Sequence, residues 1–492
     1  MHLTPRARRI ALGALFATLA GALAAAAALS WGAKTPVWRF VAIAVAAHAP
    51  YAAILFLARD LRVRPALVLG AAAVLRIALA AGRPVFSDDV YRYVWDGRAV
   101  AEGRDPYAFP PAAEELARFR DGAYDGINNK ELRTIYPPLA ELAFGAIAAV
   151  SPTVRAFQIA MALADLGVVA LLLAIARHRE GKGGRPFAAA GLAYGLSPVA
   201  CIEAAMSAHL EPLAVLPVVG AVALIAACTS PRIPAALRIG AAAGLAVGSA
   251  VKLLPLLFLA PFARRLRAPA IAVPVAVAAI YAAFWSPDLG AVRTLDAFAR
   301  RWEGNAGGFA LIEGAARTAI GAAAGAKSPD EMVHVRVLDA PARALQGTFF
   351  SLHKDGGFDP ARPGAFALSD LSRAVARGIA LAALAAVIAW TVLRRLELLA
   401  ALLWIAGAFV LLTPVMHPWY LLWILPWAAC RGATPWLAFG AALPLSYLPL
   451  DGWWARGVWD APAWIACAEY GVLAIATVWW LTAKAYGSRN SP

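Results

Sequence analysis

The stretch TVRAFQIAMALADLGVVALLLAIA, residues 153–176, decides the fold class of this chain. As an α-helix with a rise of about 1.5 Å per residue it would be about 36 Å long, and the hydrocarbon core of a bilayer is about 30 Å thick. The basic residues Arg177, Arg179, Lys182 and Arg185 follow directly. An apolar run of this length that ends in a basic cluster is typical of a transmembrane helix whose end lies in the cytoplasm.

Comparable apolar runs recur through all 492 residues. We therefore predict an all-α, polytopic transmembrane bundle of about 13–14 spanning segments, forming a single integral membrane domain over residues 1–492. The runs lie near 10–30, 37–58, 65–82, 153–176, 187–202, 211–228, 239–251, 253–263, 270–285, 374–393, 397–414, 418–430, 434–449 and 463–482.

The composition supports a lipid environment. Hydrophobic residues make up 61% of the chain and charged residues only 15%, whereas about a quarter of a soluble domain is charged. The formal net charge is +15, but the cations stand in short clusters between apolar runs and form no continuous basic face. This distribution predicts the lipid bilayer as a partner and argues against nucleic acid.

The basic clusters also predict the topology. They all lie on the cytoplasmic side if both termini are cytoplasmic and fourteen segments cross the membrane. This arrangement places two large loops outside, at 83–136 and 286–370, and we expect both to carry interfacial helices. The run 137–150 is too short to span and is expected to be re-entrant or interfacial. The run 239–263 is expected to be a broken helix pair with Lys252 near the outer surface.

The first outer loop carries the densest chemistry. Its segment Phe86–Arg98 reads FSDDVYRYVWDGR. Helical spacing places Asp89, Arg92 and Asp96 on one face, with Tyr93 beside them and Tyr91 nearby. Asp88 and Asp89 are adjacent carboxylates, and close like charges raise the pKa of one member toward the range of a general base. A guanidinium binds phosphate and aromatic rings stack on sugars, so the segment suits a sugar phosphate; an interfacial helix with structural ion pairs is the alternative.

The segment Ser87–Arg98, followed by Asp105-Pro106-Tyr107, resembles the start of bacterial polyprenyl-phosphate-dependent mannosyltransferases of the GT-C superfamily. The most similar groups are the glycosyltransferase 87 type and the actinobacterial alpha-1,6-mannosyltransferases. In the turn His209-Leu210-Glu211, Leu210 and Glu211 replace the amide and the aspartate of the family's motif. Further motifs that resemble the family, in order, are Tyr136-Pro137-Pro138-Leu139, Ser197-Pro198 leading to Glu203 and His209-Leu210-Glu211, Lys252-Leu-Leu-Pro255, Trp302-Glu-Gly-Asn305 and His417-Pro418-Trp419-Tyr420.

The resemblance implies a GT-C-like membrane glycosyltransferase of the bacterial inner (plasma) membrane, with an active site that faces the exterior. It implies transfer of a sugar, mannose in the family, from a polyprenyl-phosphate carrier to a glycan, glycolipid or protein acceptor, with inversion. An early outer-loop acid is the general base, so Asp88 and Asp89 are the candidates, with Asp89 slightly preferred for its helix face. The candidates for substrate and carrier-phosphate binding are Arg92, Lys252, His417, Tyr91, Tyr93, Asp96, Glu203, His209 and Asn305.

Two other classes of function are alternatives to a glycosyltransferase. A lipid or polysaccharide transporter or flippase, or another outer-face transferase or ligase, remains the alternative. We expect no cofactor and no metal site, because Asp88 and Asp89 lack a third ligand nearby in the sequence, although a divalent metal held by distant residues stays open. The segment Asp451-Gly-Trp453-Trp454 is typical of an interfacial anchor and receives no chemical role.

Overall fold

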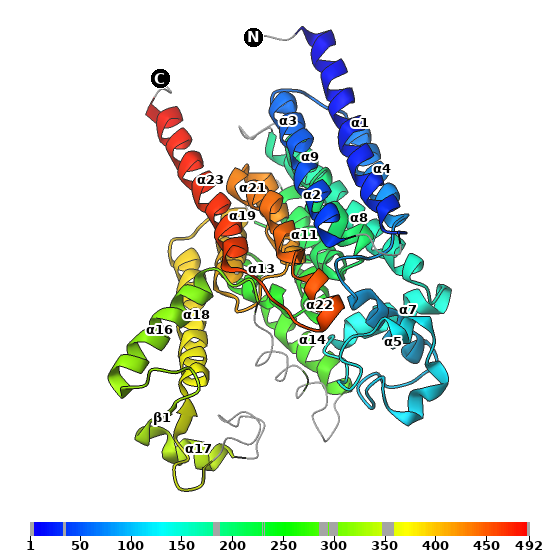
Figure 1. Ribbon diagram of the computed structural model, residues 1–492. Coiled ribbons are helices and arrows are strands. Elements are labelled where there is room, and N and C mark those ends of the chain that lie inside the picture. Colours follow the sequence, from blue (N-terminus) through cyan, green and yellow to red (C-terminus); the bar gives the residue numbers. More distant parts are fainter. Residues whose placement is uncertain are drawn as a thin grey trace.

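The computed structural model describes residues 4–32, 36–180, 187–228, 230, 232–284, 294, 304–346 and 359–489. Nearly all of this part of the chain is helical, and both termini lie at the same end of the bundle (Figure 1). The first half contains α1 (Pro5–Leu29), α2 (Val37–Ala46), α3 (His48–Ala58), α4 (Pro65–Ala80), α5 (Asp89–Ala101), η1 (Glu114–Phe119), α6 (Gly122–Asp125), α7 (Pro138–Val150), α8 (Val154–Glu180), α9 (Phe187–Gly195), α10 (Pro198–Cys201), η2 (Ile202–Met206) and α11 (Glu211–Ala227).

The second half continues the bundle and adds one small sheet. Strands β1 (Met332–His334) and β2 (Ala365–Ala367) pair antiparallel, with Val333 opposite Phe366, inside the second predicted outer loop. The remaining elements are α12 (Ala235–Val251), η3 (Leu254–Phe258), α13 (Leu259–Leu266), α14 (Pro269–Ala283), α16 (Gly308–Ala324), η4 (Arg336–Leu338), α17 (Asp339–Leu345), α18 (Leu368–Leu393), α19 (Leu398–Leu412), η5 (Pro418–Trp423), α20 (Leu425–Arg431), α21 (Thr434–Ala442), η6 (Leu443–Tyr447), α22 (Leu450–Arg456) and α23 (Ala463–Arg489).

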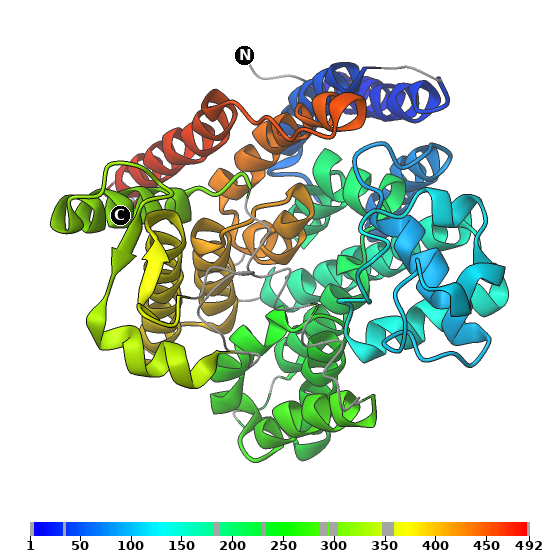
Figure 2. The same cartoon turned by 60° about the horizontal axis from the view of Figure 1, so that its bottom comes forward.

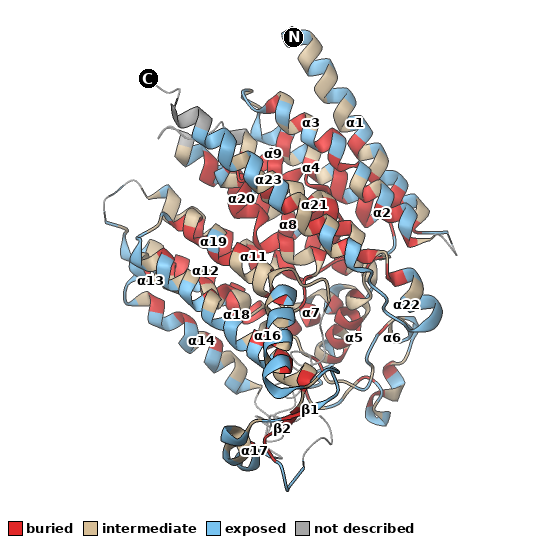
Figure 3. Ribbon diagram, turned by 60° about the vertical axis from the view of Figure 1, so that its left-hand side comes forward, coloured by how far each residue is buried: buried red, intermediate tan, exposed pale blue. Residues whose placement is uncertain are grey.

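Helix length and composition confirm the all-α, polytopic membrane class. In the described part of the chain five helices are long and apolar enough to cross a membrane: Pro5–Leu29, Val37–Ala58, Val154–Arg179, Leu368–Leu393 and Ala463–Ala485. A pair bent by 55°, Ala189–Gly195 with Pro198–Met206, would make a sixth. Several further apolar helices are shorter, so the count of about 13–14 spans stays a prediction. Exposed apolar side chains cover the outer helix faces while buried residues fill the interior (Figure 3), as lipid-facing surfaces require.

A buried ionic network lies in the middle of the bundle, between α4, α8 and α9. Arg76 donates from Nε to Asp165 Oδ2 at 2.8 Å and from Nη1 to the Gly195 carbonyl at 2.8 Å. Tyr194 donates its hydroxyl hydrogen to the other Asp165 oxygen. Charged groups are costly inside a membrane unless they are paired, so this network explains how Arg76 and Asp165 are tolerated in apolar runs.

The predicted cytoplasmic clusters contact one another in the structure. Arg8 of the first cluster lies 3.8 Å from Asp60, beside the second. Arg264 donates to the Val392 carbonyl at 3.1 Å, next to the cluster at residues 394–395. Arg179 and Arg431 both pair with the Glu397 carboxylate. These contacts are those expected of clusters on one side of a membrane, and the order of crossings stays a prediction.

The structure gives the conformation of the two runs that were not expected to be single spans, 137–150 and 239–263. Helix α7 (Pro138–Val150) packs along α5 at the lower end of Figure 1, and Phe144 stacks on Tyr93 with ring centroids 4.6 Å apart. This position agrees with a re-entrant or interfacial helix. The run 239–263 is broken as expected: α12 ends at Val251, Lys252 is extended, and η3 starts at Leu254.

Candidate active site

A cavity of about 1330 Å³ contains the first candidate residues. Its walls include the segment 84–93 with the start of α5, residues 128–137, residues 251–257 with Tyr281, residues 304–310, residues 415–420, and η6 with α22 and the residues that follow. Figure 2 shows the molecule with its bottom turned forward: the cyan segments lie on the right, the green segments at the bottom and the orange segments above them. The cavity therefore joins residues that are far apart in the sequence.

The aspartate pair lies where α5 begins. Asp88 is the N-cap residue and Asp89 the first helical residue, and both line the cavity. The Asn128 side-chain amide donates to Asp88 Oδ1 at 2.7 Å. Just before the pair, Phe86 stacks on Tyr447 with ring centroids 4.4 Å apart. The positive end of the helix dipole and the Asn128 hydrogen bond both favour negative charge at this position.

The surroundings shift the proton affinity of both carboxyls. Burial raises the pKa of Asp88 to about 7, the adjacent Asp89 carboxylate adds to this rise, and the Asn128 hydrogen bond and His209 oppose it. Burial also raises the pKa of Asp89, and nearby His209 and Lys252 oppose that rise. Two adjacent carboxyls with elevated pKa values are suited to accept a proton near neutral pH.

His209 lies directly behind Asp89. Its Nε2 is 4.0 Å from Asp89 Oδ2, and its Nδ1 is 3.0 Å from Glu203 Oε2. The Tyr447 hydroxyl donates to the other Glu203 oxygen at 2.9 Å. Glu203 lies on the π-helical turn η2, and Ala208, next to His209, has a φ of 56°, a region that non-glycine residues rarely adopt. Such local strain is common where a backbone must aim a functional side chain.

Burial opposes a positive charge on His209, but the Glu203 carboxylate outweighs it, and the pKa of His209 is raised above its ordinary value. A raised pKa favours the protonated imidazole, whose positive charge would face Asp89. Its ring also stacks on Trp419 at 3.9 Å, and His417 stacks on Trp419 at 4.1 Å. Burial lowers the pKa of His417 to about 3, so this second imidazole is neutral.

Lys252 points into the cavity from the break after α12. Its ammonium pairs with Glu211 and lies 5.2 Å from the centre of the Tyr420 ring. Glu211 is 1% exposed, so the ammonium compensates a buried carboxylate. An ammonium has three N–H donors, and those not used by Glu211 can bind an anion in the cavity.

Arg92 and Asp96 do not belong to the cavity wall. Arg92 donates from Nε to both Asp96 oxygens, at 2.8 and 2.7 Å, and from Nη1 to the Leu132 carbonyl at 3.0 Å. The guanidinium thus turns away from Asp89 and holds α5 to the chain at Leu132. Arg92 was expected to share a helix face with Asp89 but does not line the cavity, because its Nε pairs with Asp96 one turn along the helix and its Nη1 binds the Leu132 carbonyl. Tyr91 and Tyr93 do line the cavity.

The second predicted outer loop contributes Asn305. It lines the cavity with a φ of 52°, and its carbonyl accepts a hydrogen bond from the Tyr470 hydroxyl at 2.9 Å. The next residue before it, Gly304, pairs with Val415 two residues before His417, which joins this loop to the late motif. Trp302, named with Asn305 in the sequence motif, lies outside the described residues.

Several residues at the site escaped the sequence analysis. Asn128 binds Asp88, Tyr447 binds Glu203, Trp419 separates two imidazoles, and Tyr420 faces Lys252. Trp419 and Tyr420 belong to a motif that was recognised, so a closer reading could have proposed them. Nothing in the local sequence of Asn128 or Tyr447 marks them, because their partners lie in other segments.

Among the described residues there is no group of three or more His, Cys, Asp or Glu side chains that could hold a metal ion. The cavity instead combines adjacent carboxyls, an ammonium, imidazoles and many aromatic rings at one end of a membrane bundle. Carboxyls, cations and aromatic rings around one such cavity are what a membrane-embedded glycosyltransferase needs.

Comparison with known families agrees with this class. The model of the family described as alpha-(1->6)-mannopyranosyltransferase, N-terminal domain, matches residues 4–264, a little more than half of the chain. The chain belongs to this family and is a membrane mannosyltransferase, which confirms the resemblance drawn from the motifs. No curated protein and no solved structure matches the chain significantly. The matched part includes Asp88, Asp89, Glu203, His209 and Lys252, whereas Asn305 and His417 lie beyond it.

Proposed function

We propose that this enzyme transfers mannose from a polyprenyl-phosphate carrier to a hydroxyl group of a glycan, glycolipid or protein acceptor. The transfer takes place on the extracytoplasmic side of a bacterial inner membrane and inverts the anomeric configuration. The observation that carries the proposal is the shared cavity, in which the Asp88–Asp89 pair and the Lys252 ammonium line the same space.

In the proposed reaction Asp89 accepts the proton of the acceptor hydroxyl. The hydroxyl oxygen forms a new bond to the anomeric carbon while the bond from that carbon to the phosphate oxygen breaks. The electron pair of the broken bond leaves with the polyprenyl phosphate. Lys252 stabilises this anion with its free N–H donors, and neutral His417 can donate one ring N–H to it. Cations at a leaving phosphate reduce the need for a general acid.

The contacts favour Asp89 as the base and Asp88 as its neighbour. Asp88 already accepts a hydrogen bond from Asn128 at 2.7 Å, which takes up one of its oxygens. Asp89 faces His209 at 4.0 Å, and His209 lowers the pKa of Asp89 against the rise caused by burial, which favours the ionised form that accepts a proton. Glu203 then acts through His209, and the Tyr447 hydroxyl holds Glu203 from the cavity wall.

The sidedness rests on charge distribution. The contacts between basic clusters are those expected if the clusters share one side, and the positive-inside rule assigns that side to the cytoplasm. We assign the cavity with Asp88 and Asp89 to the opposite side, because its walls include residues of both predicted outer loops. A carrier lipid whose head group reaches the outer surface could present its sugar there.

A transfer assay with purified protein tests the proposal. Radiolabelled polyprenyl-phosphate mannose is supplied together with a synthetic alpha-mannoside, and the label that reaches the mannoside is measured. The double variant Asp88→Asn/Asp89→Asn should lose transfer by at least about 10²-fold, the usual contribution of a general base. Asp125→Asn, in the short helix α6 outside the cavity wall, is the matched control and should keep wild-type activity. Unchanged transfer in the double variant would contradict the proposal.

A further inference from the structure

A group of exposed tryptophans lines the same cavity as the aspartate pair. Trp453 and Trp454 belong to α22, and Trp459 follows in the next loop. They are 44%, 56% and 47% exposed, and all three belong to the cavity wall. We call these three residues the tryptophan ledge. A bilayer anchor would need no place in a cavity that contains ionisable groups, so the sequence interpretation as an interfacial anchor is incomplete.

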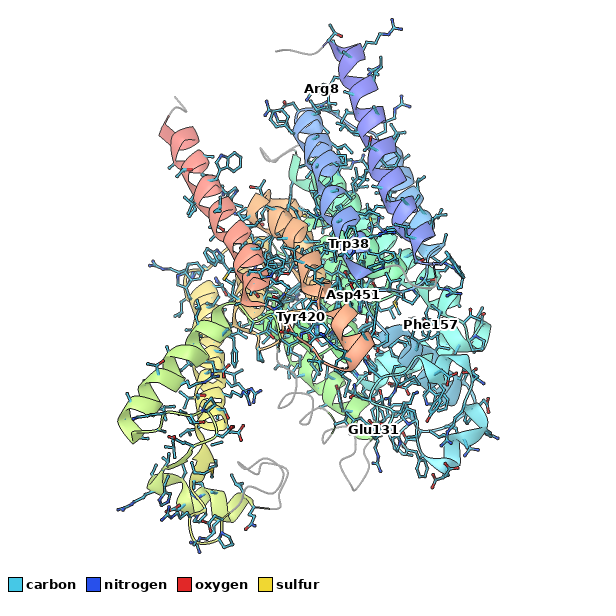
Figure 4. The ribbon with its side chains drawn as sticks, viewed as in Figure 1. Arg8, Trp38, Glu131, Phe157, Tyr420 and Asp451 are labelled. Carbon is cyan, nitrogen blue, oxygen red and sulfur yellow. The ribbon has the colours of Figure 1, made fainter. Side chains whose placement is uncertain are left out.

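The tryptophan ledge is fixed relative to the aspartates by two contacts. The Asp451 carboxylate, at the start of α22, accepts the Val37 backbone N–H at 3.1 and 3.2 Å and so ties α22 to the first turn of α2. Tyr447, just before α22, stacks on Phe86, two residues before Asp88. Figure 4 shows Asp451 near Tyr420 at the middle height of the molecule, with Glu131 below them. These contacts hold the region around α22 against α2 and against the segment just before the aspartate pair.

Another wall of the cavity is mainly aliphatic and adjoins Lys252. Leu254 and Leu257 of η3, with Tyr281 of α14, form an apolar surface that continues from Lys252. In Figure 3, α22 lies beside α2 and α6, whereas α12, α13 and α14 lie across the molecule, with α5 between them in the view. An ammonium followed by aliphatic side chains suits a lipid phosphate and its hydrocarbon chain.

The chemistry assigns the two walls to different substrates. In a displacement with inversion the attacking hydroxyl and the leaving phosphate lie on opposite sides of the anomeric carbon. If the phosphate binds at Lys252, the acceptor must enter from the side of α22. Indole rings present flat apolar faces that match the C–H faces of pyranose rings, and Asn128, Asn129 and Glu131 in the same cavity offer hydrogen-bond partners for hydroxyls.

We infer that the tryptophan ledge is the binding site for the acceptor, and that this acceptor is a neutral oligosaccharide chain whose pyranose rings stack on the indoles. The terminal sugar of that chain then reaches Asp89, and the preceding sugars lie along α22. This inference rests on the proposed function, because it takes the site of the leaving phosphate from it. Under this inference the part of the acceptor that binds the tryptophan ledge is a glycan of several sugars. A peptide or a single sugar would not fill it.

Steady-state kinetics of a double variant test the inference. Trp453→Leu/Trp454→Leu is compared with wild type, with a synthetic alpha-mannotetraoside as acceptor and polyprenyl-phosphate mannose as donor. We expect KM for the tetraoside to rise at least about tenfold, as loss of two stacking rings implies, with KM for the donor within about twofold of wild type. The conservative variant Trp453→Phe/Trp454→Phe keeps aromatic faces and should recover most of the affinity. Trp479→Leu, on α23 and 65% exposed outside the cavity wall, is the matched control.

A binding measurement separates this inference from the proposed function. Saturation-transfer NMR of the tetraoside with purified protein needs no donor, and its signal should fall in the double leucine variant and persist in Trp479→Leu. A rise in donor KM that grows with the length of the prenyl chain would overturn the inference, because it would assign the ledge to the carrier. Equal effects of Trp453→Leu/Trp454→Leu and Trp479→Leu would also overturn it. Absence of any transfer by wild type, with tetraoside binding intact, would contradict the proposed donor and leave the ledge supported.

Discussion

At the scale of single residues, the charge of Asp89 depends on side chains from several separate segments. His209, Lys252 and Glu211 act on it across the site, Tyr93 contacts it from α5, and Asp88 is its chain neighbour. The two cations favour the ionised carboxylate, and burial and the other carboxylates oppose it. Because these effects oppose one another, removal of any one of these side chains should change the pKa of Asp89.

Replacement of His209 should shift the pH dependence of the reaction. His209 lowers the pKa of Asp89 against the rise caused by burial. In His209→Asn this opposition is lost, so the pKa of Asp89 rises further and a higher pH is needed to ionise the base. We expect the acid limb of the kcat/KM profile to move upward by roughly one pH unit, with activity at pH 9 less affected than at pH 6.

The control for this profile is His334→Asn. His334 pairs with Asp339 at 2.9 Å in the second loop and does not line the cavity. Its replacement should leave both limbs of the profile in place. An unchanged acid limb in His209→Asn, together with an unchanged maximum, would show that His209 does not act on the base.

Lys252 combines a structural and a functional role that paired variants can separate. Lys252→Met should lose donor binding and also leave Glu211 buried without its partner, which typically costs about 3–5 kcal/mol. The double variant Lys252→Met/Glu211→Gln removes both charges, so we expect thermal stability to return toward wild type. Donor KM should stay raised in the double variant. Recovery of donor KM along with stability would mean that Lys252 supports only the fold.

At the scale of elements, the position of the aspartate pair depends on how α5 packs against α7. A Cβ on Gly97 would lie 2.5 Å from the Phe144 carbonyl oxygen, and one on Gly145 would lie 2.5 Å from Val100 Cγ1. Small residues on both helices therefore permit their close approach. Since Asp88 and Asp89 stand at the first turn of α5, displacement of this helix would also move the candidate base.

Gly97→Ala should therefore destabilise the protein and reduce transfer together. The added methyl group clashes with the α7 backbone, which cannot move as a flexible side chain would, and overpacking of this kind costs about 1–3 kcal/mol. The melting temperature of purified protein and the transfer rate give the readout. Gly70→Ala, in α4 with open space around the position of the added methyl group, is the control and should melt at or slightly above the wild-type temperature.

At the scale of the whole molecule, the first basic cluster lies far from the candidate site along the bundle. Arg8 lies at the upper end of Figure 4 and Glu131, in the cavity wall, lies toward the lower end. The distribution of charge along the chain orients the whole bundle in the membrane, and this orientation decides which compartment meets the cavity.

Cysteine labelling in intact cells tests this orientation. In a background without the native cysteines, Glu131→Cys should react with a membrane-impermeant maleimide added outside. Arg62→Cys, in the exposed basic segment after α3, should react only after the membrane is permeabilised. The reverse pattern would place the cavity in the cytoplasm and contradict the proposed use of an outward-facing carrier lipid.

The amino-acid sequence was enough to predict the class of fold, the break at Lys252 and the candidate aspartates. Each of these follows from local features: the length of an apolar run, a charge that interrupts it, or adjacent acids at its end. The family motifs added His209, Lys252 and His417, which the structure brings to one cavity or directly behind it.

The contacts between distant segments required the three-dimensional structure. Packing of the helices joined Tyr447 to Glu203 across 244 positions of the chain and placed Trp453 and Trp454 in the wall of the cavity. These contacts depend on how helices distant in sequence pack together, and the pattern within any one run carries no information about its partners in space.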